Sequence, residues 1–292
     1  MAKRIRANLF LVNRLLVREP CDEKPRKIRH FLSLYLQRTK SNKMKIGMIG
    51  AGLIGGTLVR QYTNAGHSVK MTNSSGAEKL KNLALETGAS AVTLADAVTD
   101  VDVIVISIPL IAILKLPKRL LKSGSANITI IDTCNYYPIR DGIIKDIEDG
   151  MPESVWVSNQ IQLPVIKAYN SILVESLEAS GLPKAAESRL ALPIAGDDKQ
   201  SKDLVSILVN DSGFDSLDYG SLQDSWKQQP GSPVYCTDLT LPQLKKSIEK
   251  TRRELLPERR ELGLIYIMSH DPKLWKDKVT YNRKIYESDL GN

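Results

Sequence analysis

The chain has 292 residues, of which 42% are hydrophobic and 25% are charged, a composition typical of globular proteins and not of disordered or fibrous ones. Its net charge is +8, but residues 1–43 hold 12 of the basic and 3 of the acidic side chains and account for all of this excess. The rest of the chain has 29 basic and 30 acidic side chains, which argues against a nucleic-acid-binding protein. The longest apolar stretch, residues 103–114, is too short to span a bilayer, so we expect no integral membrane segment.

The basic segment, residues 1–43, is rich in arginine and poor in acidic residues. A transit peptide or a helix on a membrane surface could have this composition. Met44 stands directly before the first predicted strand, where a natural first residue would stand. We therefore expect residues 1–43 to be a disordered and dispensable extension, and we assign no chemistry to them.

The three cysteines, Cys21, Cys134 and Cys236, are widely separated along the chain. Their spacing fits neither a disulfide framework nor a metal site, and it indicates a reducing compartment. We therefore expect a cytoplasmic protein with no bound metal.

A glycine motif follows the first predicted strand, residues 45–49, and precedes a helical stretch and a second strand at residues 68–72. This order within about 30 residues is the context in which the motif Gly-x-Gly-x-x-Gly binds a dinucleotide. The first glycine permits the tight turn, the second lets the backbone approach the diphosphate, and the third lets the helix pack close to the strand. The residues expected to contact the cofactor here are Gly50, Ala51, Gly52, Leu53, Ile54 and Gly55.

The residues after the second strand favour NADP over NAD. An NAD enzyme usually has an acidic residue there to hold the ribose 2′-hydroxyl, but this chain has no carboxylate before Glu78. Donors that could hold a 2′-phosphate stand in its place, namely Asn73, Ser74, Ser75 and Lys79. The alternative is that these are ordinary polar turn residues.

Strands and helices continue to alternate after this turn, with strands predicted at residues 91–93, 101–108 and 128–132. The continuous β-branched run at 101–108 is typical of a strand buried on both faces of a parallel sheet. We therefore predict a doubly wound α/β domain at residues 44–150 that binds NADP. Because ligands bind at the carboxyl ends of such strands, we expect Ile108, Pro109 and Asn135 to border the nicotinamide.

The second half of the chain is predicted to be a small α/β extension, residues 151–238, that completes the substrate site. Its predicted strands are residues 155–158, 165–169 and 189–194, and its predicted helices are residues 172–179 and 199–210. Residues 239–292 are predicted to be a helical tail with an apolar stripe along residues 244–262. Such a helix would dock on the body of the protein or on a second subunit, so a homodimer stays open.

Acid–base candidates are few. The three histidines do not follow predicted strands, and His67 is expected in a surface turn. Lys167 or Tyr136 could serve as a base, although Lys167 is as well explained by a positioning role. Nothing around Cys134 indicates a lowered pKa, and we predict no catalytic residue. This favours hydride transfer between two ring cofactors, which needs mainly stacking and distance.

Seven motifs occur in an order that resembles a known family. They are Gly-Ala-Gly-Leu-Ile-Gly at 50–55, Ile-Asp-Thr-Cys-Asn-Tyr-Tyr-Pro at 131–138, Val-Ile-Lys-Ala-Tyr-Asn at 165–170, Pro-Ile-Ala-Gly-Asp-Asp at 193–198, Gly-Phe-Asp at 213–215, Asp-Tyr-Gly at 218–220 and Gln-Pro-Gly-Ser-Pro at 229–233. Together they resemble the NADP oxidoreductase family whose founding members reduce NADP with the deazaflavin coenzyme F-420. The resemblance covers about residues 44–238.

The resemblance implies a Rossmann domain with a small extension, NADP(H) in the crevice, and a redox partner lying flat against the nicotinamide. Coenzyme F-420, FMN or FAD would be that partner, as a co-substrate. The family commonly holds the 2′-phosphate with Asn-Ser-Arg-Gly, and this chain has Ser75 in place of the arginine. Losing a bidentate guanidinium weakens the preference for NADP over NAD that the resemblance implies.

The leading hypothesis is therefore an NADP-dependent oxidoreductase that passes hydride between NADP(H) and a flavin-like or deazaflavin acceptor, a small molecule. One alternative is a reductase or dehydrogenase of a small carbonyl or imine. The other is a non-catalytic NADP-binding sensor, for which the predicted helix at residues 241–268 is the candidate partner surface.

Overall fold

The computed structural model describes residues 43–117, 121, 128–270 and 275–287. Residues 44–292 form one compact unit. We expected residues 1–43 to be disordered. All of them except Lys43 lie outside the described residues.

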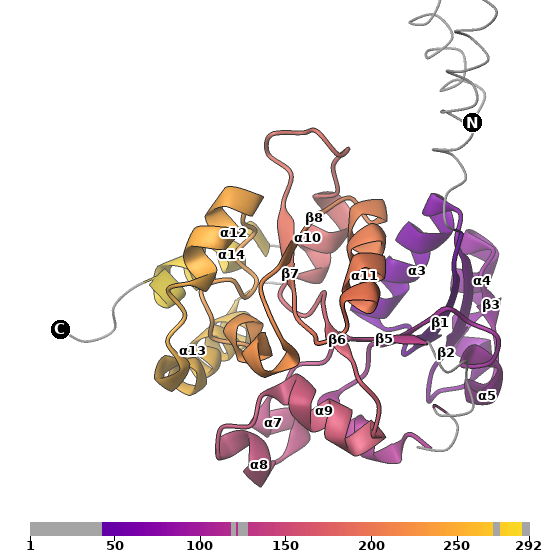
Figure 1. Ribbon diagram of the computed structural model, residues 1–292, viewed down its shortest axis with the longest axis horizontal. Helices are drawn as coiled ribbons and strands as arrows, with labels where there is room; N and C mark the ends of the chain where they lie inside the picture. Colours follow the sequence, from indigo (N-terminus) through magenta and orange to yellow (C-terminus); the bar gives the residue numbers. More distant parts are fainter. Residues whose placement is uncertain (1–42, 118–120, 122–127, 271–274, 288–292) are drawn as a thin grey trace, which may run out of the picture. The chain divides into compact units, whose positions relative to one another are not determined.

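A six-stranded parallel sheet organises this unit, with the strand order β3-β2-β1-β4-β5-β6 (Figure 1). The strands are β1 (Lys45–Ile49), β2 (Ser68–Thr72), β3 (Ser90–Ala91), β4 (Val103–Ile106), β5 (Thr129–Asp132) and β6 (Ile166–Lys167). This order is that of a doubly wound nucleotide-binding fold and confirms the predicted fold class. Ile49 is in register with Thr72 on one side and Ile106 on the other, so β1, β2 and β4 end at the same edge of the sheet.

Helices and 3-10 turns connect the strands and, after β8 (Asp215–Asp218), form the rest of the described chain. They are α3 (Leu53–Ala65), η1 (Ala77–Leu80), α4 (Lys81–Thr87), α5 (Leu94–Ala97), η2 (Leu110–Lys115), α7 (Pro138–Asp141), α8 (Lys145–Glu148), α9 (Glu153–Ile161), α10 (Val174–Ala179), α11 (Lys199–Asp211), η3 (Leu222–Gln228), α12 (Leu241–Ile248), η4 (Arg253–Leu255), α13 (Leu256–Ser269) and α14 (Trp275–Glu287). No helix in the described ranges combines the length and the apolar character that crossing a membrane requires.

Two apolar cores lie on opposite faces of the sheet, and β4 contributes alternately to both. Val103 and Val105 pack in the core that contains residues of α3 and α11, whereas Ile104 and Ile106 pack in the core that contains residues of α9. Since successive side chains of a strand point to opposite faces, a strand covered on both sides must be apolar throughout. This explains the continuous β-branched run of β4.

A second, two-stranded parallel sheet, β7 (Ala191–Ile194) with β8 (Asp215–Asp218), forms the extension, and α11 connects its strands. The backbone amide of Lys167 in β6 donates to the carbonyl of Ala195, which joins this small sheet to the edge of the large one. The strand predicted at residues 155–158 is wrong, because this segment belongs to α9. Its Trp156, Val157 and Ile161 are buried at helical spacing, and packing therefore overrides their β propensity.

The tail forms three helices in place of the single apolar stripe that was predicted. Helix α12 ends at Ile248, and Pro257 stands in the first turn of α13, where proline does not disturb a helix. Helix α14 packs on α13, and a Cβ at Gly263 would lie 2.4 Å from the Tyr286 hydroxyl. The prediction of a helical tail is confirmed for the described residues.

Candidate functional site

The glycine loop between β1 and α3 is packed so closely that only glycine fits at two of its positions. Gly50 has φ +93°, and a Cβ there would lie 2.2 Å from the carbonyl oxygen of Ser107 after β4. A Cβ at Gly55 would lie 2.0 Å from the carbonyl oxygen of Gly50. These contacts fix the loop at the carboxyl edge of the sheet.

Gly52 faces open space instead. No atom lies within 4 Å of where its Cβ would be, and its φ of −77° is accessible to any residue. No side chain caps the N-terminus of α3, and Leu53 in the first turn is 76% exposed. A helix N-terminus with accessible amides attracts a phosphate, so this edge of the loop fits the diphosphate of a dinucleotide.

The turn after β2 carries the residues predicted to hold a 2′-phosphate. Ser74, Ser75 and Lys79 are exposed, and Asn73 is half-buried with its Oδ1 atom lacking a hydrogen-bond partner. The carboxylate of Glu78 accepts a hydrogen bond of 2.5 Å from Lys81. The turn therefore offers exposed donors for a phosphate, which fits NADP.

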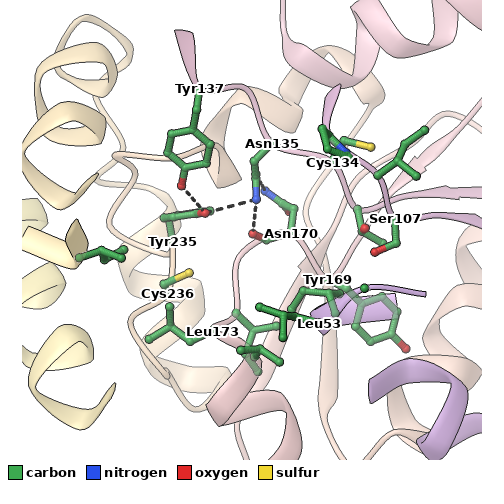
Figure 2. Close-up of a pocket in the computed structure, with 18 of the residues that line it drawn as sticks. Leu53, Ser107, Cys134, Asn135, Tyr137, Tyr169, Asn170, Leu173, Tyr235 and Cys236 are labelled. Carbon is green, nitrogen blue, oxygen red and sulfur yellow. Dashed lines mark hydrogen bonds between the residues drawn. The ribbon is translucent and has the colours of Figure 1, made fainter. Parts of the chain in front are cut away.

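A cavity of about 570 Å³ extends from the start of α3 along the carboxyl ends of β4 and β5 (Figure 2). Among the predicted cofactor contacts, Gly52, Leu53, Ile54, Ile108, Pro109 and Asn135 line it. The other predicted cofactor contacts belong to the glycine loop, α3 and the region after β2, and they do not line this cavity. They are Gly50, Ala51, Gly55, Asn73, Ser74, Ser75 and Lys79. Its opposite wall comes from distant segments, namely residues 172–175, Tyr235, Cys236, Ile267 and Lys278.

Asn135, the expected neighbour of the nicotinamide, is held by a network of amides (Figure 2). Its Nδ2 donates to the carbonyl of Asn170 at 2.9 Å, and the Nδ2 of Asn170 donates back to the Asn135 Oδ1 at 3.0 Å. The Nε2 of Gln228 donates to the Oδ1 of Asn170 and fixes the second member of the pair. Asn135 is thus a rigid part of the cavity wall.

Two tyrosines meet in the cavity, and sequence reasoning missed both. The hydroxyls of Tyr137 and Tyr235 lie 2.7 Å apart, and burial raises the pKa of each, so both stay protonated at neutral pH. The predicted candidate was Tyr136, but its hydroxyl donates to the carbonyl of Gly142 and its ring packs in the core with α9. If the segment after β5 is treated as extended, Tyr136 and Tyr137 are expected to point to opposite faces, because successive side chains alternate. This could have distinguished the core tyrosine from the cavity tyrosine.

Lys167 is fully buried and does not line the cavity, so the structure does not place it as a base toward a ligand there. Its Nζ lies 3.3 Å from Asp132 Oδ2 and 4.0 Å from Glu153 Oε2, and it donates to the carbonyl of Cys134. The ammonium thereby holds the segment that carries Cys134 and Asn135 into the cavity. Burial raises the pKa of the Cys134 thiol, which leaves it a poor nucleophile.

His67 is not in a surface turn, as predicted, but buried. Its Nδ1 accepts a hydrogen bond from the backbone amide of Met44, and its Nε2 lies 3.2 Å from Asp211. It joins β1 to α11 and does not line the cavity. In the described ranges, no group of three or more His, Cys, Asp or Glu side chains could hold a metal ion.

Comparison with known families identifies the first part of this site. Residues 45–136, from β1 to the segment after β5, match the family model "NADP oxidoreductase coenzyme F420-dependent". The resemblance to this family is confirmed for residues 45–136. The matched residues include the glycine loop and the ends of β4 and β5.

Individual relatives extend the comparison. The Escherichia coli (strain K12) protein YjhV is 46% identical over 57 residues, which are 20% of this chain and 42% of YjhV, so the match spans less than half of that relative. The crystal structure of the hypothetical protein SMa0349 from Sinorhizobium meliloti has 25% identity and a TM-score of 0.60, over 71% of this chain and 98% of that one. A "putative f420 dependent nadp-reductase" from Arthrobacter sp. FB24 has 17% identity and a TM-score of 0.50, over 61% and 86%, and shares the fold.

The buried Glu153 predicts a specific dependence of stability on pH. Burial raises the pKa of its carboxyl from 4.5 to about 7, although Lys167 opposes this shift. Between these values the folded protein holds a proton that the unfolded chain has lost, so the free energy of unfolding falls as pH rises through this window. We expect Glu153→Gln to remove this fall, so that the variant gains about 3 kcal/mol relative to wild type between pH 4 and pH 8.

Urea denaturation at a series of pH values measures this difference. Glu187→Gln, at an exposed carboxylate, is the matched control. A free-energy difference between Glu153→Gln and wild type that stays constant over this pH range would show that Glu153 does not retain a proton in the folded state.

Proposed function

We propose that the chain is an NADP-dependent oxidoreductase that passes hydride between NADP(H) and a flavin-like or deazaflavin acceptor. The observation that carries this proposal is a continuous cavity that runs from the open edge at Gly52 past the ends of β4 and β5. In a doubly wound fold this is the path of a dinucleotide from its diphosphate to its nicotinamide. The family match over residues 45–136 supports the same cofactor.

In this proposal, residues 44–150 bind the cofactor and residues 151–238 complete the acceptor site. The glycine loop and the N-terminus of α3 hold the diphosphate, while Asn73, Ser74, Ser75 and Lys79 hold the adenosine ribose and its phosphate. Ile108 and Pro109 exclude water beside the nicotinamide, and Asn135 fixes the position of the ring. When bound, NADPH supplies a hydride, and the oxidised acceptor takes up that hydride together with one proton.

A second candidate, reduction of a small carbonyl or imine, is favoured by Tyr137 and Tyr235. Their protonated hydroxyls meet in the cavity, and such a group could donate a proton to the oxygen or nitrogen of the substrate. Hydride transfer between two rings does not require this donor. The effect of Tyr137→Phe therefore separates the two reactions.

Oxidation of NADPH, followed by the loss of its nicotinamide absorbance, tests the proposal. FMN, FAD, coenzyme F-420 and a panel of small carbonyl compounds are each offered as acceptor to the full chain. We expect rapid oxidation with one of the ring acceptors, and a change of less than about threefold in Tyr137→Phe, because the protein supplies mainly position.

Oxidation only with a carbonyl compound, lowered at least about 100-fold in Tyr137→Phe, would instead establish the second candidate. Tight NADPH binding with no oxidation by any acceptor would contradict both enzymatic functions and support a sensor.

The serine at position 75 predicts a modest preference for NADPH over NADH. Ser75 is exposed on the turn after β2, so a longer side chain fits there without displacing its neighbours. We expect Ser75→Arg to raise the ratio of the NADH to the NADPH dissociation constant by at least about 10-fold, because a guanidinium binds a phosphate through two hydrogen bonds.

Nicotinamide fluorescence measures both dissociation constants. Ser188→Arg, at an exposed site, is the matched control and should leave the ratio unchanged. An unchanged ratio in Ser75→Arg would place the 2′-phosphate elsewhere.

A further inference from the structure

Helix α14 carries a buried lysine into the cavity. Lys278 lines the wall opposite the glycine loop, although it lies more than 200 residues further along the chain. Its side chain is 8% exposed. A lysine side chain this buried places its aliphatic part against the protein and directs its ammonium to the cavity or to an acidic partner.

The partner that Lys278 has is too far away to satisfy it. Its Nζ lies 3.8 Å from the Oε1 of Glu175, beyond hydrogen-bond distance, and the Glu175 side chain is 29% exposed. Among the described residues, this long ion pair is the contact found for the Lys278 ammonium, which has three protons to donate. Both charged groups line the same cavity.

The position of Lys278 is fixed by the contacts of α14. One turn further along, the Asn282 Nδ2 donates to the carbonyl of Cys236, and the guanidinium of Arg283 donates to the carbonyls of Thr237 and Asp238. The ring of Tyr281 stacks on that of Tyr266 in α13 at 3.7 Å. The lysine is therefore held at the cavity wall by its helix and does not reach it as a flexible surface side chain.

We propose that Lys278 is an anion receptor of this cavity and binds a phosphate or carboxylate group of the ligand. An anion on the cavity side would supply the hydrogen-bond acceptor that Glu175 is too distant to provide, and it would compete with Glu175 for the ammonium. The inference rests on the proposed function in one respect, that the cavity holds NADP(H) and its acceptor. Two sources share this chemistry, the diphosphate of the dinucleotide and an acidic group of the acceptor.

Equilibrium binding to the full chain distinguishes the two sources. The probes are NADPH, measured by nicotinamide fluorescence, and FMN and riboflavin, measured by quenching of flavin fluorescence in the presence of NADP⁺. FMN and riboflavin differ by one phosphate. We expect Lys278→Gln to weaken binding of either NADPH or FMN by at least about 10-fold, the effect of losing one charge-assisted hydrogen bond, and to leave riboflavin unchanged.

Two further variants sharpen the test. Glu175→Gln removes the competing carboxylate and should strengthen binding of the same probe by at least about twofold, whereas a merely structural pair would make both variants weaken it. Lys276→Gln, on the exposed side of α14, is the matched control and should change nothing. Thermal melting of each variant establishes that it is folded.

The outcomes are separable. Weaker NADPH binding assigns the anion to the cofactor, and weaker FMN binding with unchanged riboflavin binding assigns it to the acceptor. Unchanged binding of NADPH and FMN in folded Lys278→Gln, or an equal loss for FMN and riboflavin, would overturn the proposal. Wild-type protein that binds no NADPH would instead contradict the proposed function, and the FMN and riboflavin pair would still decide the role of Lys278.

Discussion

The close approach of Gly50 to the end of β4 is the constraint on which the rest of the site depends. The parallel register brings β1, β2 and β4 to one edge of the sheet. There the glycine loop passes so close to the strand end that a Cβ at Gly50 would lie 2.2 Å from the carbonyl oxygen of Ser107. Because the loop turns so tightly, α3 starts at the sheet edge with no side chain capping it and with open space beside Gly52. The accessible helix N-terminus at Gly52 therefore follows from backbone packing.

The rest of the cavity is built by segments that the chain brings back from a distance. Lys167 in β6 holds the segment after β5, and Asn170 and Gln228 hold Asn135 on it. Tyr235 then closes the wall through its hydrogen bond with Tyr137. Except for the one between Gln228 and Asn170, each of these contacts joins a residue of the nucleotide-binding half to a residue of the extension. The extension therefore fixes the position of cavity residues that the nucleotide-binding half supplies.

The sequence predicted most of the nucleotide-binding half, because strands buried on both faces and a glycine turn leave strong local patterns. The strands β1, β2, β4 and β5 lie within two residues of their predicted bounds. The predictions failed where packing at a distance decides the structure. Residues 155–158, which belong to α9, were predicted as a strand, and His67 was placed on the surface because its partner Asp211 is far away in sequence.

The opposite wall of the cavity could not be predicted for a related reason. Tyr235 and Lys278 carry no motif of their own, and only the fold of the tail brings them to the glycine loop. Tyr137 stands in a predicted motif, but the choice between it and Tyr136 depends on which face of the segment after β5 each side chain occupies. These are contacts between residues distant in sequence, which periodicity alone does not encode.

The most direct test of the account is the affinity of NADPH for wild-type protein and for Gly52→Val. The φ of Gly52 is −77° and a Cβ there has no neighbouring atom within 4 Å, so we expect the variant to fold, as thermal melting checks, while its side chain occupies the space assigned to the diphosphate. The account predicts a dissociation constant at least about 30-fold higher than that of wild type, which corresponds to about 2 kcal/mol. Equal affinity in the two folded proteins would contradict it, because the dinucleotide would then bind elsewhere.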